Sequence, residues 1–296
     1  MRTTLTQVKV KLKIAPIAVH EVLARLFKKC LQGEDIPQDW KKAHITSIYK
    51  KGDRMKFENY RGISITSSIG RLYGRVIKMR LEGILQDAEE QSGFCAGRLC
   101  IDNIFCLKQL SEKSISYGQD TCLTFVDLRK AYDTVPMNKL WNVMRVAGIN
   151  EIYVKAVKHF YENNVSAIKI SNRVSESFQV TKVLRQGCAM APSLFKININ
   201  EALKKWKQHC ETMGIPINDK FLYTLLFADD QVVIAMDEQD SSYMIRKLHE
   251  KYKKWGLDIN YEKTEQLVIG REGNNMVLGP NTIRDCVRFK YLGVIE

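Results

Sequence analysis

The sequence lacks a hydrophobic run long enough to cross a membrane as a helix, which takes about 20 residues. Its longest apolar stretch, residues 222–236, is interrupted by Asp229 and Asp230. The amino-terminal segment alternates lysines with short apolar stretches, and it has neither the apolar core nor the cleavage site of a signal peptide. These absences argue against a membrane protein and predict an intracellular one with no membrane partner.

Cysteine patterns typical of zinc sites are also missing. The chain has 8 cysteines but no CxxC pair, and Cys95, Cys100 and Cys106 have no histidine nearby. Without a secretory signal, the pattern favours free, buried thiols in a reducing compartment.

The chain is strongly basic. It has 46 Lys and Arg against 33 Asp and Glu, a net charge of +13 over 296 residues. Charge alone favours a polyanionic partner: nucleic acid is the first candidate, an acidic membrane face is the alternative that charge by itself leaves open, and a merely soluble basic protein is the third. The hydrophobic fraction of 45% predicts a folded core in one large domain or two interleaved small ones.

Hydrophobic periodicity predicts a mixture of helices and strands. Helical spacing occurs in residues 19–31, 69–85, 140–147, 153–161 and 245–255. Short apolar segments predict strands at 122–128, 165–170, 178–184, 222–227, 232–236 and 266–269. Because helices and strands do not alternate strictly, the predicted class is α+β.

Three carboxylates occur where apolar strands are expected. Asp127 ends the strand TFVDL, and Asp229 and Asp230 lie between two apolar segments. Taken alone, Asp127 could cap a strand end or helix, and the Asp pair could be a hairpin turn. Side by side in one sheet, however, the two strands would gather three hard oxygen ligands that suit Mg²⁺ and phosphoryl transfer.

These residues lie within an ordered set of motifs. The segments are 36–43 (IPQDWKKA), 49–53 (YKKGD), 59–64 (NYRGIS), 125–133 (FVDLRKAYD), 184–188 (LRQGC) with 192–195 (PSLF), 227–230 (FADD), 260–265 (NYEKTE) and 289–293 (FKYLG). In this order they resemble the reverse transcriptase domain of non-LTR (LINE-type) retrotransposons, over nearly the whole chain. The family's fingers motif often has Pro where this chain has Gly62, and its motif at 184–195 often has a bulkier residue where this chain has Ala189.

The resemblance implies the fingers and palm of a right-hand polymerase, with an antiparallel palm sheet flanked by helices and the thumb absent. It divides the chain into an N-terminal helical extension, 1–30, and a reverse transcriptase domain, 31–296. The fingers would cover about 31–118 and 140–180, and the palm the remainder. The missing thumb and endonuclease would belong to a longer polyprotein, and a nuclear location is plausible by the same resemblance.

The resemblance also implies site residues. Asp127, Asp229 and Asp230 would bind two Mg²⁺ ions, for which Mn²⁺ could substitute, and Lys263 would be the general acid unless it is only an exposed loop lysine. The residues implied to bind the deoxynucleoside triphosphate are Lys50, Lys51, Arg61, Tyr132, Gln186 and Gly187. Instead of binding the triphosphate, Lys50 and Lys51 could lie in a solvated turn, and Tyr132 could be a core residue.

The remaining implied residues would contact an RNA template and a DNA primer. These are Arg185, Tyr291, Leu292 and Gly293. Arg185 could touch a template phosphate or pair with a surface acid.

The predicted activity is RNA-directed DNA synthesis by two-metal phosphoryl transfer. The alternative is a catalytically silent, nucleic-acid-binding remnant of such an element. An RNA-dependent RNA polymerase is disfavoured because Tyr132 is an aromatic residue where a 2′-hydroxyl would need room. Group II intron and telomerase-type enzymes share the palm but match the motif spacing less well.

Overall fold

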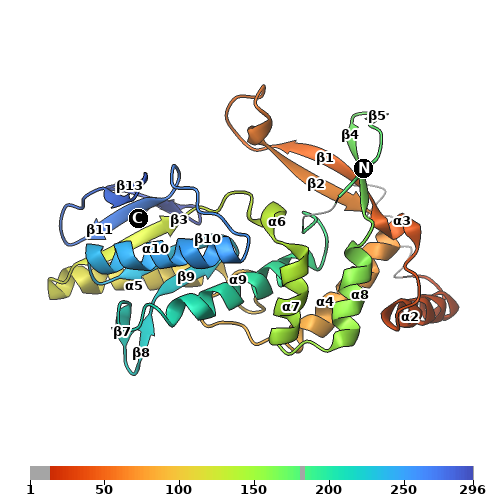
Figure 1. Cartoon of the computed structure of the whole chain (residues 1–296), viewed down its shortest axis with the longest axis horizontal. Coiled ribbons are helices and arrows are strands. Elements are labelled where there is room, and N and C mark those ends of the chain that lie inside the picture. Colours follow the sequence, from red (N-terminus) through yellow and green to blue (C-terminus); the bar gives the residue numbers. More distant parts are fainter. Residues whose placement is uncertain (1–13, 181–183, 296) are drawn as a thin grey trace. The chain divides into compact units, whose positions relative to one another are not determined.

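The computed structural model describes residues 14–180 and 184–295, which form two compact units (Figure 1). The first unit comprises Met1–Leu85 and Met137–Leu194, and the second comprises Gln86–Pro136 and Phe195–Glu296. Residues 86–118, which we expected in the fingers, group with the second unit because Leu107 packs in the core of its sheet. Part of the predicted extension 1–30 lies outside the described residues; the described part belongs to the first unit.

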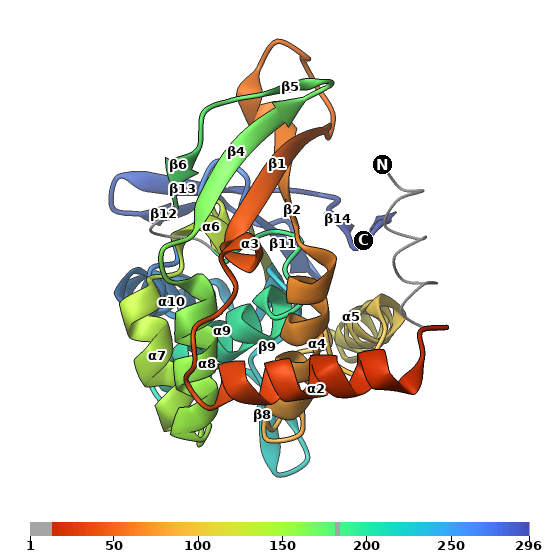
Figure 2. The same cartoon turned by 90° about the vertical axis from the view of Figure 1, so that its right-hand side faces the viewer.

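The first unit contains a five-stranded sheet and helices. Its elements are α2 (Ile17–Leu31), α3 (Gln38–Lys41), β1 (Lys42–Tyr49), the short 3₁₀ helix Phe57–Asn59, β2 (Tyr60–Thr66), α4 (Ser68–Glu82), α7 (Met137–Val146), α8 (Glu151–Tyr161), β4 (Val165–Ile170), β5 (Arg173–Val174) and β6 (Phe178–Gln179). Strands β1 and β2 form an antiparallel hairpin, and β4 runs parallel beside β1 (Figure 2). The helices meet around four aromatic side chains, Phe27, Trp40, Tyr73 and Phe160.

The second unit is built on a six-stranded sheet with the order β12-β13-β11-β3-β10-β9. Its elements are α5 (Cys100–Tyr117), β3 (Thr121–Val126), α6 (Ala131–Thr134), β7 (Ile215–Ile217), β8 (Lys220–Leu222), β9 (Thr224–Phe227), β10 (Asp230–Ala235), α10 (Glu238–Lys254), β11 (Glu265–Ile269), β12 (Met276–Leu278), β13 (Asn281–Asp285), β14 (Lys290–Tyr291) and β15 (Val294–Ile295). Helix α9 (Ala191–Lys207) starts in the first unit and continues into the second. The central strands β11, β3, β10 and β9 pair antiparallel, as predicted for a palm sheet, while β11 and β13 pair parallel.

Alternation along the central strands gives the sheet two different faces. Leu123 and Phe125 of β3 join an apolar cluster with Leu107 of α5 and Tyr291 of β14. On the other face, Thr124 bonds to Ser241 of α10 at 3.0 Å. Because successive side chains of a strand point to opposite faces, α5 and α10 cover opposite sides of the sheet.

The face under α10 is buried but polar. Gln231 of β10 accepts a hydrogen bond from the Tyr252 hydroxyl at 2.6 Å, and its amide donates to Thr224 of β9 at 3.1 Å. Ser241 also donates to Gln266 of β11 at 3.3 Å. Burial raises the pKa of Tyr252, so its hydroxyl stays neutral and serves as a donor. These bonds fix α10 at one position across three strands, which apolar packing alone specifies less sharply.

The predicted elements can now be compared with the observed ones. The helices predicted from periodicity and the strands predicted at 122–128, 165–170, 222–227, 232–236 and 266–269 are present, with shifted ends. The strand predicted at 178–184 is limited to Phe178–Gln179 in the described residues. All 8 cysteines are free, as expected, but Cys100 and Cys106 are exposed rather than buried. No helix within residues 14–180 and 184–295 is long and apolar enough to span a membrane.

Tyr252→Phe tests the polar face. Removal of the hydroxyl leaves the buried Gln231 carbonyl oxygen without its donor, which should lower the free energy of unfolding by about 1–3 kcal/mol. Urea denaturation measures this loss. Tyr117→Phe, at a side chain that is 74% exposed, is the matched control and should leave the free energy unchanged. Equal stability of both variants would contradict a structural role for the Tyr252 bond.

Candidate active site

The three predicted carboxylates lie at one end of the paired strands β3 and β10. The register places Gln231 opposite Val126, so the next position places Asp230 opposite Asp127. Asp229 precedes β10 in the two-residue turn that joins it to β9. Because Asp127 and Asp230 each lie two residues from a residue of the apolar cluster, both belong to the face of the sheet that carries this cluster. The fold therefore brings Asp127 to the end of the sheet that carries the adjacent pair Asp229 and Asp230, about 100 residues further along the chain.

Asp127 is held by the segment that precedes β11. Its carboxylate oxygen Oδ2 accepts a hydrogen bond from Asn260 Nδ2 at 2.9 Å, and its carbonyl accepts one from the Asn260 backbone N–H at 2.8 Å. Its own backbone N–H donates to the hydroxyl of the buried Thr264 at 3.2 Å. Sequence reasoning found the motif around Asn260 but gave this residue no role. The 133 positions between Asn260 and Asp127 leave no local signal from which this contact could be predicted.

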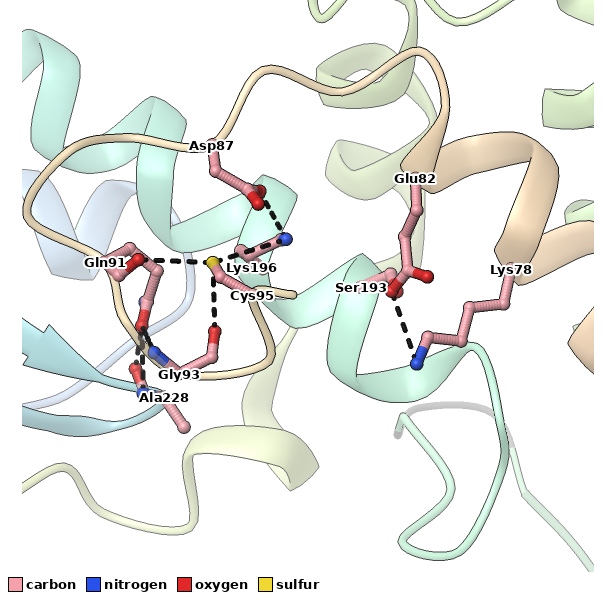
Figure 3. A network of polar contacts seen from close by, with 9 residues as sticks. All are labelled: Lys78, Glu82, Asp87, Gln91, Gly93, Cys95, Ser193, Lys196 and Ala228. Atoms are coloured by element: carbon pink, nitrogen blue, oxygen red, sulfur yellow. Dashed lines mark hydrogen bonds and ion pairs between the residues drawn. The ribbon is translucent and has the colours of Figure 1, made fainter. Parts of the chain in front are cut away.

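The turn that carries Asp229 has a specific partner. Ala228 has a φ of 63°, in the left-handed region that L residues seldom adopt. Its backbone N–H donates to Gln91 Oε1 at 3.0 Å, and Gln91 Nε2 donates to its carbonyl at 3.4 Å (Figure 3). Sequence reasoning missed Gln91, because an isolated glutamine in a loop gives no signal of this kind.

The residues predicted to grip the primer have different environments. Tyr291 is only 3% exposed, its hydroxyl accepts a hydrogen bond from Asn103 at 3.3 Å, and it belongs to the apolar cluster. Burial, and to a lesser degree the charge of Asp230, raises the pKa of Tyr291. Its side chain is thus a core residue, a correction to its predicted contact with nucleic acid. Leu292 and Gly293 form the turn between β14 and β15, where both have positive φ.

Lys263 and Tyr132 lie in the same unit as the carboxylates. Lys263 is exposed in the turn before β11, and its backbone N–H donates to the Asn260 carbonyl at 3.1 Å. Tyr132 is half-buried in α6, and its ring stacks on Phe195 with centroids 4.6 Å apart. A planar ring fixed in this way suits either a core position or a wall against a nucleotide sugar, so its role stays a prediction.

In the first unit, Lys50, Lys51 and Arg61 lie at the end of the β1–β2 hairpin where a loop joins the two strands. The Lys50 backbone N–H donates to the Asn59 carbonyl at 2.8 Å, and Arg61 pairs with Ile48 in the register. All three basic side chains are exposed. The hairpin therefore carries three exposed cations near its loop, and their contact with a triphosphate stays a prediction.

Arg185 differs from both of its predicted roles. It is 2% exposed, and its guanidinium donates to the backbone carbonyls of Trp40 at 3.3 Å and Lys41 at 2.6 Å. Burial lowers the pKa of Arg185. The side chain is therefore a buried structural residue that links its segment to α3 within the first unit, rather than a surface group that binds template or an acid.

Gln186 and Gly187 follow Arg185 in the sequence and lie beside β2. The Gln186 carbonyl accepts a hydrogen bond from the Ser64 backbone N–H at 2.8 Å. Gly187 has a φ of +104°, and an added Cβ would lie 2.8 Å from the Ser64 carbonyl oxygen. The close approach of the chain to β2 therefore explains why a glycine is needed at position 187. The contact of Gln186 and Gly187 with a nucleotide stays a prediction.

The carboxylate set fits a divalent metal in its chemistry. All of its donors are hard oxygens at one edge of a sheet, the ligand type that Mg²⁺ and Mn²⁺ prefer. Within the described part of the chain, no three His, Cys, Asp or Glu side chains are already close enough to hold an ion. Ligation would thus require these side chains to turn toward one another.

Comparison with known proteins agrees with this arrangement. The family described as "Reverse transcriptase (RNA-dependent DNA polymerase)" matches residues 48–295. Similar curated proteins include a Xenopus laevis transposon TX1 protein of 149 kDa, 25% identical over 75% of this chain and 17% of its own length. Another is the Pol polyprotein of a type-1 retrotransposable element R2 from Popillia japonica, 25% identical over 87% of this chain and 38% of its own length.

Solved structures show a similar fold. Apo telomerase from Candida tropicalis aligns with a TM-score of 0.56 and 15% identity, covering 84% of this chain and 54% of that one. The chain spans well under half of the two curated relatives named above. Members of the matched family use divalent metal ions and bind a nucleic acid template. From the family match and its retrotransposon relatives, the chain belongs to the reverse transcriptase family, as a reverse transcriptase domain of the LINE type.

Proposed function

We propose that this chain carries the polymerising site of an RNA-directed DNA polymerase that extends a DNA primer along an RNA template. The observation that carries the proposal is the convergence of Asp127, Asp229 and Asp230 at one end of β3 and β10. Its substrates would be deoxynucleoside triphosphates. The proposed cofactor is a pair of Mg²⁺ ions, for which Mn²⁺ could substitute.

The metal ions would supply charge stabilisation for the attacking and leaving oxygens of phosphoryl transfer. Asp127 and Asp229 would hold them, with Asp230 completing the carboxylate set. Asn260 donates to Asp127 Oδ2, so it orients this carboxylate and leaves Oδ1 available for ligation.

Groups outside the carboxylate cluster would bind and orient the nucleotide. Lys50, Lys51 and Arg61 would balance the charge of the triphosphate, and Gln186 and Gly187 would lie beside the nucleotide. Tyr132 would limit the space at the sugar, and Leu292 and Gly293 would support the primer. The exposed ammonium of Lys263 would donate a proton to the departing pyrophosphate.

Asp127→Asn and Asp229→Asn test the cluster. Each removes a charged ligand, and the loss of several kcal/mol of transition-state stabilisation should slow primer extension about 1,000-fold or more. Single-turnover extension on an RNA template measures the rate, and a filter assay measures RNA binding, which should persist. Asp219→Asn, at an exposed turn between β7 and β8, is the control. Unchanged extension by both site variants would refute the assignment, whereas binding without extension by the unsubstituted chain would favour a silent remnant.

Asn260→Ala tests the hydrogen bond to Asp127. A carboxylate that loses its orienting donor should bind metal less well, with a loss in rate of about 10- to 100-fold, the usual range for such partners. The rate should recover partly at high Mg²⁺, because excess metal compensates for weaker binding. Asn142→Ala, at an exposed position of α7, should extend normally. A normal rate at low Mg²⁺ in Asn260→Ala would show that the bond has no part in the reaction.

Tyr132→Val tests the choice of sugar. If the ring excludes a 2′-hydroxyl, its removal should improve ribonucleotide use relative to deoxynucleotide use by about 100-fold, equivalent to about 2.7 kcal/mol. Single-turnover incorporation of matched nucleotide pairs gives the ratio of kcat/KM. Tyr117→Val, exposed on α5, should keep the original ratio. The same ratio in Tyr132→Val would leave the tyrosine as a packing residue of α6.

A further inference from the structure

The loop that precedes α5 pairs with the outer strand of the second unit's sheet. The Leu226 backbone N–H donates to the Glu90 carbonyl at 2.8 Å, and the Ser92 backbone N–H donates to the Leu226 carbonyl at 2.8 Å. Since β9 is the edge strand of this sheet, the loop supplies hydrogen bonds that the edge would otherwise leave to water. The segment is therefore an ordered part of the sheet, placed directly beside the turn that carries Asp229.

Within this loop, the Gln91 side chain makes three hydrogen bonds that converge on the turn. Its Oε1 accepts from the backbone N–H of Ala228 at 3.0 Å and from that of Gly93 at 2.8 Å, and its Nε2 donates to the Ala228 carbonyl at 3.4 Å. The residue is 1% exposed, so water does not compete for these bonds. Both polar groups of Ala228, the residue with the positive φ, are thus bonded to one amide side chain.

Close packing reinforces these bonds. A Cβ added to Gly93 would lie 2.0 Å from the Ala228 backbone nitrogen, so only glycine allows the loop to approach this far. Asn103 of α5 donates to the Leu226 carbonyl at 3.0 Å and accepts from the Ser92 hydroxyl at 2.7 Å. Hydrogen bonds from the loop therefore hold the turn, and a hydrogen bond from Asn103 of α5 holds β9, the strand before the turn.

The loop is itself fastened to α9 by two ion pairs, of which Figure 3 shows the one between Lys196 and Asp87. Lys196, whose side chain is 4% exposed, pairs with Asp87 and donates to the Cys95 sulfur at 3.7 Å. Lys207 pairs with Glu90 at 2.6 Å. Both ends of the loop are thus fixed within the second unit, which gives Gln91 a rigid base.

We propose that Gln91 is a positioning residue that holds the Ala228–Asp229 turn in the conformation from which the Asp229 carboxylate can turn toward Asp127 to bind metal. A residue in the left-handed region tends to relax, and rotation of the peptide bond after Ala228 would redirect the next side chain. Gln91 opposes this relaxation by bonding the N–H and the carbonyl of Ala228 together. The inference rests on the proposed function, because it takes Asp229 to be a metal ligand.

The test compares Gln91→Met with the unsubstituted chain. Methionine has a similar length and fills the space, but it cannot make the three hydrogen bonds. Mn²⁺ affinity is measured by electron paramagnetic resonance on the complex of the chain with an RNA–DNA primer-template, and primer extension is measured across a range of Mg²⁺ concentrations. Gln119→Met, at an exposed position after α5, is the matched control.

The proposal expects at least a tenfold weaker Mn²⁺ affinity and a matching rise in the Mg²⁺ concentration for half-maximal extension in Gln91→Met. Primer-template affinity and the control variant should be unchanged. Gly93→Ala, which displaces the turn by contact, should shift the same two quantities in the same direction. A general structural role would lower the extension rate equally at all Mg²⁺ concentrations without changing metal affinity, and that result would overturn the proposal.

The two proposals fail in different ways. If the unsubstituted chain binds Mn²⁺ through Asp127 and Asp229 but extends no primer, the proposed function fails, while the Mn²⁺ titration of Gln91→Met still decides the positioning role. If the unsubstituted chain extends primers and Gln91→Met has normal metal affinity, only the positioning role fails.

Discussion

The antiparallel pairing of β3 with β10 is the constraint on which the candidate site depends. These two strands come from segments about 100 residues apart, and their register alone places Asp127 opposite Asp230. A slip of one residue would turn one of these carboxylates to the other face of the sheet. The register is in turn set by the two faces of the sheet, because Leu123 and Phe125 must reach the apolar cluster while Thr124 must reach Ser241. The site is therefore a consequence of core packing several residues away.

Two neutral amide side chains, those of Asn260 and Gln91, form hydrogen bonds around the carboxylates. The Asn260 amide donates to the Asp127 carboxylate, and the Gln91 amide bonds to the backbone of Ala228, the residue before Asp229. An amide suits this role because it adds no charge to a place where a metal ion must be attracted. The lysines of α9 that pair with the loop, Lys196 and Lys207, have Asp87 and Glu90 as their partners.

Several parts of the structure could be predicted from the sequence, and the reasons for the failures are physical. The carboxylates and the amphipathic helix α10 gave clear signals, since an acid in an apolar strand is costly and a one-sided helix has a regular period. Helix α9 was missed because polar residues such as Lys196 and Asn198 are buried together with Leu194 and Ile199, so its apolar residues do not follow a one-sided period. Helix α5 was missed because Ile101 and Phe105 are exposed while the polar Asn103 faces the sheet.

The site shows the same limits. The motifs located the three aspartates, but burial of Arg185 and Tyr291 depends on long-range packing that no local pattern reports. Gln91 and Asn260 act across 137 and 133 positions of the sequence, respectively, so their partners become apparent only in the folded chain. The order of the motifs therefore indicated candidate site residues, and the structure shows which of these residues are in contact.

The central claim is that Asp127 and Asp229 hold a divalent metal ion at the end of β3 and β10. It is tested most directly by replacing Mg²⁺ with Fe²⁺ and generating hydroxyl radicals, which cleave the backbone next to the bound iron. Mass spectrometry of the fragments locates the cuts. The account predicts cleavage near residues 127 and 228–230, suppressed by excess Mg²⁺ and lost in Asp127→Asn and Asp229→Asn. Cleavage confined to other segments, or cuts at these positions that persist in both variants, would contradict it.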